Sequence, residues 1–137
     1  MSAKILCPTD GTDHGMTGVV KAAELSKLTG QPMTIAIVNV AHGGPRGPTI
    51  NHWTHDEIQS MLAAAEAKAR EAGAVAVNTV ELVAREPGPA IVAYADQEGF
   101  GQIVMGTGDK TGVKRLVLGS VAAAVAGSAH CTVTVAR

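Results

Sequence analysis

The chain has 137 residues, of which 46% are hydrophobic and 17% charged, a composition typical of one globular domain and not of a disordered chain. A formal net charge of −1 and an aromatic content of 2% argue against nucleic acid as a partner, because such binding uses basic surfaces and aromatic stacking. No segment approaches the roughly 20 apolar residues of a membrane span or resembles a signal sequence, so we expect a cytoplasmic protein with no membrane insertion. The two cysteines, Cys7 and Cys131, are expected to be buried, reduced thiols.

Apolar strand-like segments and helical segments alternate along the chain. The expected strands are residues 4–9, 33–40, 74–83, 102–105 and 131–136. The expected helices run from Thr12 or Asp13, either of which can cap the first helix, to about 29, and over about 54–72, 87–98 and 120–128. Residues 41–51 form a loop rich in glycine, proline and histidine. This order predicts an α/β fold, a doubly wound parallel sheet of five strands with helices on both faces.

The segment between the fourth strand and the last helix is rich in glycine and ends on Gly119-Ser120 at the helix start. Glycines after a strand and a helix N-terminus both offer free backbone N–H groups to an anion, usually phosphate. Neither the P-loop motif nor the dinucleotide-binding fingerprint fits the spacing, because Asp109 and Thr111 stand where glycines are required. If the first and fourth strands are neighbours, Asp10 and Gly106 face each other across one crevice at their carboxyl ends.

Several segments resemble the universal stress protein family. They are residues 5–10 (Ile-Leu-Cys-Pro-Thr-Asp), 37–40 (Ile-Val-Asn-Val), 103–107 (Ile-Val-Met-Gly-Thr), 111–121 (Thr-Gly-Val-Lys-Arg-Leu-Val-Leu-Gly-Ser-Val) and 129–137, with Thr132 where proline is common. The resemblance implies a single domain over residues 1–137 with a flavodoxin-like sheet, also described as adenine nucleotide alpha-hydrolase-like, of order 3-2-1-4-5. It also implies a homodimer paired through the fifth strand, from Cys131 to Arg137. Many members hold ATP, and others bind no nucleotide.

The resemblance also implies roles for individual residues around the crevice. The strand end at Pro8, Thr9 and Asp10 would meet the adenosine, and the backbone of Val40 would bond the adenine edge. Met105 would also belong to the nucleotide site. Gly106 and Gly108 would let the backbone approach the phosphates, and Gly119, Ser120 and Val121 would offer N–H groups and a hydroxyl. Other roles remain open from the residues alone: Asp10 as a turn or N-cap carboxylate, Ser120 as a helix N-cap, and Lys114 and Arg115 as solvated charges.

Nucleotide-binding members carry glycine, two residues, glycine, nine residues, then Gly-Ser or Gly-Thr. Here Gly106 and Gly119-Ser120 keep that spacing, but Asp109 replaces the middle glycine and Gly108 lies one position early. A carboxylate near phosphates costs on the order of 1 kcal/mol or more unless Lys110, Mg²⁺ or an outward rotation of the Asp109 side chain compensates. Three interpretations stay open: the loop binds ATP, it favours AMP, ADP or another anion, or it is an empty structural loop.

No nucleophile and base pair indicates catalysis, and at most slow ATP hydrolysis would be expected. We therefore expect a homodimeric regulatory protein of the stress response that binds ATP and acts on a protein partner that the sequence does not identify. The alternative is an interaction module of the same fold that needs no nucleotide. His42, His52, His55 and Asp56 cluster near the second helix, but without a specified third ligand we expect no metal site there, only a polar loop able to fold over the ligand.

Overall fold

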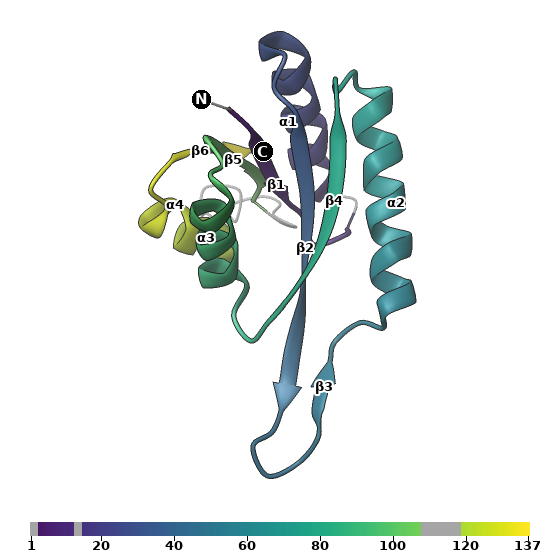
Figure 1. Cartoon of the computed structure of the whole chain (residues 1–137), viewed down its shortest axis with the longest axis vertical. Helices are drawn as coiled ribbons and strands as arrows, with labels where there is room; N and C mark the ends of the chain where they lie inside the picture. Colours follow the sequence, from purple (N-terminus) through teal and green to yellow (C-terminus); the bar gives the residue numbers. More distant parts are fainter. Residues whose placement is uncertain (1–2, 13–14, 108–118) are drawn as a thin grey trace.

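The computed structural model describes residues 3–12, 15–107 and 119–137 (Figure 1). Its strands are β1 (Ile5–Pro8), β2 (Met33–Gly43), β3 (Thr49–Asn51), β4 (Val77–Ala84), β5 (Gln102–Gly106) and β6 (Thr132–Ala136). Its helices are α1 (Gly15–Thr29), α2 (His55–Glu71), α3 (Pro87–Glu98) and α4 (Ser120–Ser128). The alternation of strands and helices therefore agrees with the sequence prediction.

Five strands form a parallel sheet in the order β4-β2-β1-β5-β6. This order confirms the predicted arrangement 3-2-1-4-5, counted without the additional strand β3. In particular β1 and β5 are neighbours, with Ile5 opposite Gln102 and Leu6 opposite Ile103. The carboxyl ends of the first and fourth predicted strands therefore lie side by side, as a shared crevice requires.

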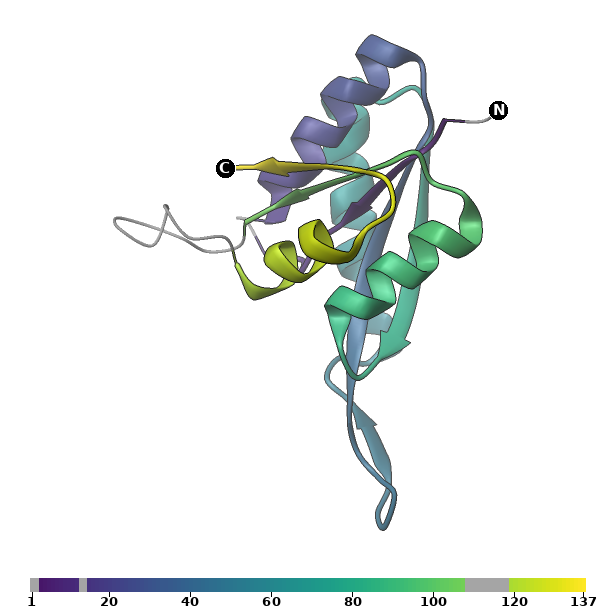
Figure 2. The same cartoon turned by 90° about the vertical axis from the view of Figure 1, so that its left-hand side faces the viewer.

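The prediction that residues 41–51 form a loop is wrong. β2 continues to Gly43, and β3 pairs with its end in antiparallel register, with Ala41 opposite Asn51 and Gly43 opposite Thr49. The resulting hairpin projects away from the sheet and helices, at the bottom of Figures 1 and 2. Glycine and proline favour a turn, but here they occupy only the tip of a hairpin whose two arms pair through their backbones.

Two strand boundaries also differ from the prediction. Residues 74–76 precede β4 instead of forming its start, because Gly73 and Ala74 donate their amides to Arg70 and Ala69 and thereby close the end of α2. Cys131 likewise precedes β6. Both segments are apolar or β-branched, so their composition did not distinguish a strand from the approach to one.

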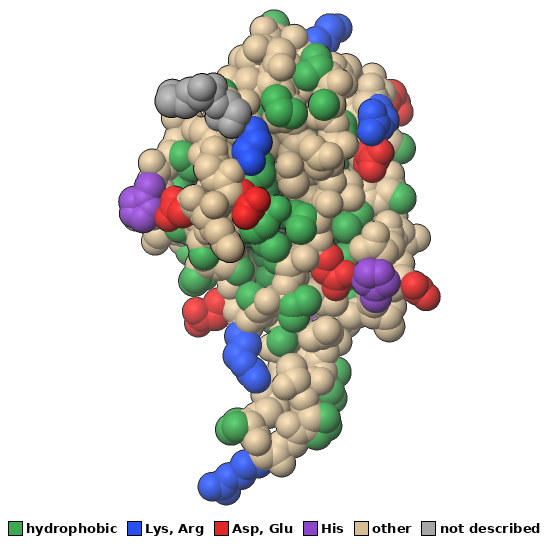
Figure 3. Space-filling model, viewed as in Figure 1, with side chains coloured by type: hydrophobic (Ala, Val, Ile, Leu, Met, Phe, Trp, Pro, Cys, Tyr) green, Lys and Arg blue, Asp and Glu red, His purple; other side chains and the backbone are tan. Residues whose placement is uncertain are grey.

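The sheet separates two hydrophobic layers because successive residues of a strand point to opposite faces. Ile5 and Cys7 of β1 join Ile35 and Ile37 of β2 in the layer under α1 and α2. Leu6 lies in the other layer, which α3 and α4 cover. Hydrophobic side chains are visible on the surface of the molecule (Figure 3). Val80, Leu82 and Tyr94 pack against the second layer and are only half buried.

Polar caps fix the starts of both helices on the first face. The Thr12 hydroxyl accepts the Gly15 amide at 3.1 Å and caps α1, as predicted for Thr12; the other candidate, Asp13, lies outside the described residues. Thr54 and Glu57 form a reciprocal capping box at α2, with bonds of 3.1 and 3.0 Å. The hydrogen bond from the Thr54 backbone lowers the pKa of the Glu57 carboxyl.

Burial agrees with the prediction for Cys7, which is fully buried, whereas Cys131 is only half buried. Both thiols are free. Desolvation raises the pKa of Cys7 from 9.0 to about 12, because the charged thiolate has no water around it in the apolar core. Among the described residues, no helix has both the length and the apolar content needed to cross a membrane.

The buried thiol makes a prediction about alkaline stability. Above pH 9.0 the unfolded chain loses the Cys7 proton and the folded chain keeps it, so the free energy of unfolding must fall as pH rises through the window from 9.0 to about 12. We expect a loss of about 2 kcal/mol between pH 9.0 and about pH 11. Urea unfolding of the native chain and of Cys7→Ala at several pH values measures this change in the free energy of unfolding. A Cys7→Ala chain with the same alkaline slope would contradict the expectation.

Candidate functional site

A cavity of about 460 Å³ opens at the carboxyl ends of β1, β2 and β5. The N-terminal turns of α3 and α4 and the segment before α2 complete its walls. Ligand sites of parallel α/β sheets lie at this edge, and the volume is within the range of small-molecule sites. The cavity is therefore the candidate site.

Nine of the eleven predicted site residues line this cavity. They are Pro8, Thr9, Asp10, Val40, Met105, Gly106, Gly119, Ser120 and Val121. The other two, Gly108 and Asp109, lie outside the described residues, as do Lys114 and Arg115. Residues from four separate segments of the chain thus meet around one space.

One end of the cavity is formed by the N-terminus of α4 and the end of β5. Gly119 is the N-cap residue: its backbone is extended (φ −61°, ψ 156°), and its carbonyl accepts the Ala123 amide at 2.9 Å. The interpretation of Ser120 as the N-cap is therefore wrong, since Ser120 is the first helical residue. Among the described residues no side chain caps this helix. Its first residues, Gly119 to Ala122, line the cavity, so the positive end of the helix dipole lies at the cavity wall.

The Asp10 carboxylate has a structural role in addition to its place at the cavity. Its Oδ1 accepts the Thr12 amide at 3.0 Å and the Thr12 hydroxyl at 2.6 Å. The predicted turn role of Asp10 is confirmed, because these two bonds hold Thr12 where it caps α1. The N-cap of α1 is Thr12 and not Asp10. Asp10 remains exposed at the cavity and keeps lone pairs for a ligand hydroxyl.

The opposite end of the cavity is mostly apolar. Most of the residues that line it were not among those predicted from the sequence. Its lining residues are Ile37, Val38, His52, Trp53, Pro87 and Ile91. Thr107, after β5, and Ala122, in the first turn of α4, are further lining residues at the end described above. Several of the residues at the apolar end could have been expected at the carboxyl end of the second strand and at the start of the Pro87 helix. Trp53 had a further signal, because it is the only tryptophan in the chain.

The backbone of Val40 is partly engaged already. Its carbonyl accepts the His52 amide at 2.8 Å, where the hairpin returns toward α2. A carbonyl oxygen has two lone pairs, so a second donor is still possible. His52 stands edge-on to Trp53, with ring centres 4.6 Å apart, and both side chains border the cavity.

The histidines do not assemble a metal centre in the part of the chain that the structure describes. His42 and His52 are neighbours, with ring centres 6.1 Å apart. His55 points elsewhere, with Nδ1 3.0 Å from Oε1 of Glu81 on β4. No group of three or more candidate metal ligands occurs among the described residues.

Comparison with known proteins agrees with this fold and cavity. The sequence profile of the universal stress protein family matches residues 1–137. A universal stress protein of Methanocaldococcus jannaschii is 34% identical over 140 residues, which cover 98% of this chain and 81% of that protein. The chain belongs to the universal stress protein family.

Two solved structures are similar over nearly their whole lengths. The universal stress protein from Archaeoglobus fulgidus in complex with dAMP is 25% identical, with a TM-score of 0.74 and coverage of 100% of this chain and 98% of that one. A universal stress protein in complex with cAMP is 24% identical, with a TM-score of 0.76 and coverage of 99% and 97%. The second structure, at 24% identity, shows that the two proteins share a fold. Both were solved with an adenine nucleotide.

Proposed function

We propose that this universal stress protein binds an adenine nucleotide, ATP in the first instance, in the cavity at the carboxyl ends of β1, β2 and β5. Binding would change the affinity of a homodimer for a regulatory protein partner during stress, and no catalytic step is required. The observation that carries the proposal is the convergence of nine predicted residues on one cavity that has the N-terminus of α4 at one end.

The two ends of the cavity suit the two ends of a nucleotide. Ile37, Val38, Trp53 and Ile91 offer apolar and aromatic surface to a base. Gly106 and the first amides of α4 offer hydrogen-bond donors to phosphate oxygens. Asp10 lies at the end of β1, next to β5, where its carboxylate can accept hydrogen bonds from ribose hydroxyls.

The relative from Archaeoglobus fulgidus supports the same ligand class, because it was solved with dAMP and shares the fold over the whole chain. A monophosphate needs fewer donors than a triphosphate does, so AMP and ADP are the natural competitors of ATP. Mg²⁺ would accompany a triphosphate by neutralising part of its charge.

Calorimetric titration of the chain with ATP, with and without Mg²⁺, tests the proposal. We expect saturation near one nucleotide per chain. Parallel titrations with AMP, ADP and inorganic triphosphate separate the contribution of the base from that of the phosphates. No binding of any adenine nucleotide at millimolar concentration would rule the proposal out and leave the nucleotide-independent interaction module as the function.

Asp109 offers a direct test of that alternative, although it lies outside the described residues. Asp109→Gly restores the spacing of nucleotide-binding members and removes one negative charge from the chain between β5 and α4. We expect ATP to bind about fivefold more tightly in the variant, since a nearby like charge costs on the order of 1 kcal/mol. Affinity for adenosine, which has no phosphate, should not change and serves as the control. Unchanged ATP affinity would mean that Asp109 does not oppose the phosphates.

We also propose that the chain forms a homodimer through β6, the last strand of the sheet. Within the described residues β6 pairs only with β5, so its other edge is open to a second copy. Thr134 is the middle residue of β6, and a twofold-symmetric pair would bring its two copies together. We expect Thr134→Lys to convert the dimer to a monomer in sedimentation at micromolar concentration, with Thr17→Lys on exposed α1 as control. A native chain that sediments as a monomer contradicts the proposal.

A further inference from the structure

The Asn39 side chain fastens Trp53 to the sheet. Asn39 lies on β2 and is 1% exposed. Its Oδ1 accepts the Trp53 amide at 2.9 Å, and its Nδ2 donates to the Trp53 carbonyl, also at 2.9 Å. Both backbone groups of Trp53 are therefore bound by one side chain, and the neighbouring His52 amide is held by Val40.

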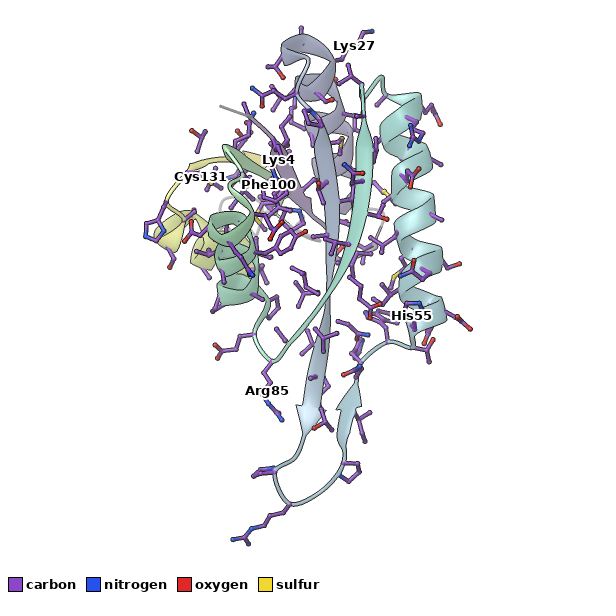
Figure 4. The ribbon with its side chains drawn as sticks, viewed as in Figure 1. Lys4, Lys27, His55, Arg85, Phe100 and Cys131 are labelled. Atoms are coloured by element: carbon purple, nitrogen blue, oxygen red, sulfur yellow. The ribbon has the colours of Figure 1, made fainter. Side chains whose placement is uncertain are left out.

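The second hydrogen of that amide group points to a carboxylate. Asn39 Nδ2 is 3.1 Å from Oε2 of Glu81 on β4, and Oε1 of Glu81 is 3.0 Å from His55 Nδ1. The Glu81 side chain is 16% exposed, whereas His55 is 73% exposed, at the start of α2 beside β4 (Figure 4). The carboxylate fixes which way the Asn39 amide faces, because only its nitrogen can donate to Glu81 and to the Trp53 carbonyl.

We infer that Asn39 and Glu81 are positioning residues for the apolar end of the cavity: they hold Trp53 and His52 as the wall against which the base of the nucleotide lies. This inference rests on the proposed function for its ligand. The position of Trp53 itself can be measured without any ligand. Neither Asn39 nor Glu81 lines the cavity, so they act on the ligand through Trp53 and His52.

The sharpest variant is Asn39→Asp, which keeps the shape of the side chain and replaces its donors with acceptors. The new carboxylate faces both the Glu81 carboxylate and the Trp53 carbonyl, so the Trp53 backbone should detach. Adding Glu81→Gln supplies an amide that can donate to the new carboxylate, and the double variant should recover part of the loss. Glu66→Gln, in the surface pair with Arg70, is the control for loss of a carboxylate.

Two readouts distinguish positioning from general destabilisation. Because Trp53 is the only tryptophan in the chain, its fluorescence emission and the quenching of that emission by acrylamide measure how accessible the Trp53 ring is in the protein without ligand. We expect quenching to increase in Asn39→Asp, to fall back partly in the double variant and to stay native in Glu66→Gln. We also expect ATP affinity to drop about tenfold in Asn39→Asp while the affinity for inorganic triphosphate, which has no base, stays the same.

If Asn39→Asp does not fold, Glu81→Ala gives the same test, since it removes one bond of Asn39 and leaves the core intact. Native quenching of Trp53 in whichever of Asn39→Asp and Glu81→Ala folds would overturn the inference, as would an equal loss of affinity for ATP and inorganic triphosphate in that variant. If the native chain binds no ATP, the proposed function is wrong, and the quenching of Trp53 alone then decides the positioning role.

Discussion

Replacing Gly18 by alanine is expected to lower the free energy of unfolding by about 3 kcal/mol, with a larger loss for valine. Gly18 is buried on α1, where the helix crosses the end of β5. A Cβ at this position would lie 2.6 Å from the Gly106 nitrogen and 2.9 Å from the Met105 carbonyl carbon. Both contacts are with backbone, so no side-chain rotation relieves them, and either α1 or β5 must move.

The same displacement should weaken the site, because Met105 and Gly106 line the cavity. Gly127→Ala provides the control: Gly127 is exposed on α4, and, apart from its own helix backbone, no described residue has an atom within 4 Å of the added Cβ. That change should raise the free energy of unfolding by about 0.5 to 1 kcal/mol, as alanine restricts the unfolded chain. Urea unfolding measures both. A Gly18→Ala chain as stable as the native one would show that α1 and β5 are not packed at this distance.

Asp10→Ala is expected to weaken ATP binding about thirtyfold, since it removes a charged acceptor of ribose hydroxyls and the turn that holds it. Asp10→Asn should lose less, because its amide oxygen can still accept from Thr12. The measurement is the calorimetric dissociation constant for ATP and for inorganic triphosphate. Asp10 would contact the sugar, so only the ATP constant should change.

Thr12→Val separates the two roles of Asp10. It removes the hydroxyl that bonds Asp10 and caps α1, at a cost of about 1 kcal/mol in stability, and leaves the carboxylate in place. We expect ATP binding close to native in this variant. If Thr12→Val and Asp10→Ala weaken ATP equally, then Asp10 serves the turn alone and makes no contact with the nucleotide.

Most of the architecture could be predicted from local signals. Short apolar runs such as residues 5–8 form fully buried strands, and Pro87 begins α3 where its missing N–H leaves no donor unpaired. Strand order followed from the family resemblance, and the structure confirms it. Given that order, residues at the ends of β1 and β5 had to lie close together, which is why Asp10 and Gly106 could be assigned to one site.

The sequence alone therefore determined the alternating fold and the segments at its ligand-binding edge, because burial periodicity, helix caps and glycine turns depend on neighbouring residues. Only the tertiary structure decided the hairpin of β2 and β3 and the wall built by Asn39, Glu81 and Trp53. The hairpin pairs residues 6 to 10 positions apart, from Gly43 with Thr49 to Ala41 with Asn51. The wall joins residues 14 and 42 positions apart, Asn39 with Trp53 and Asn39 with Glu81. These pairings depend on distances in the folded chain, which the local sequence pattern does not contain.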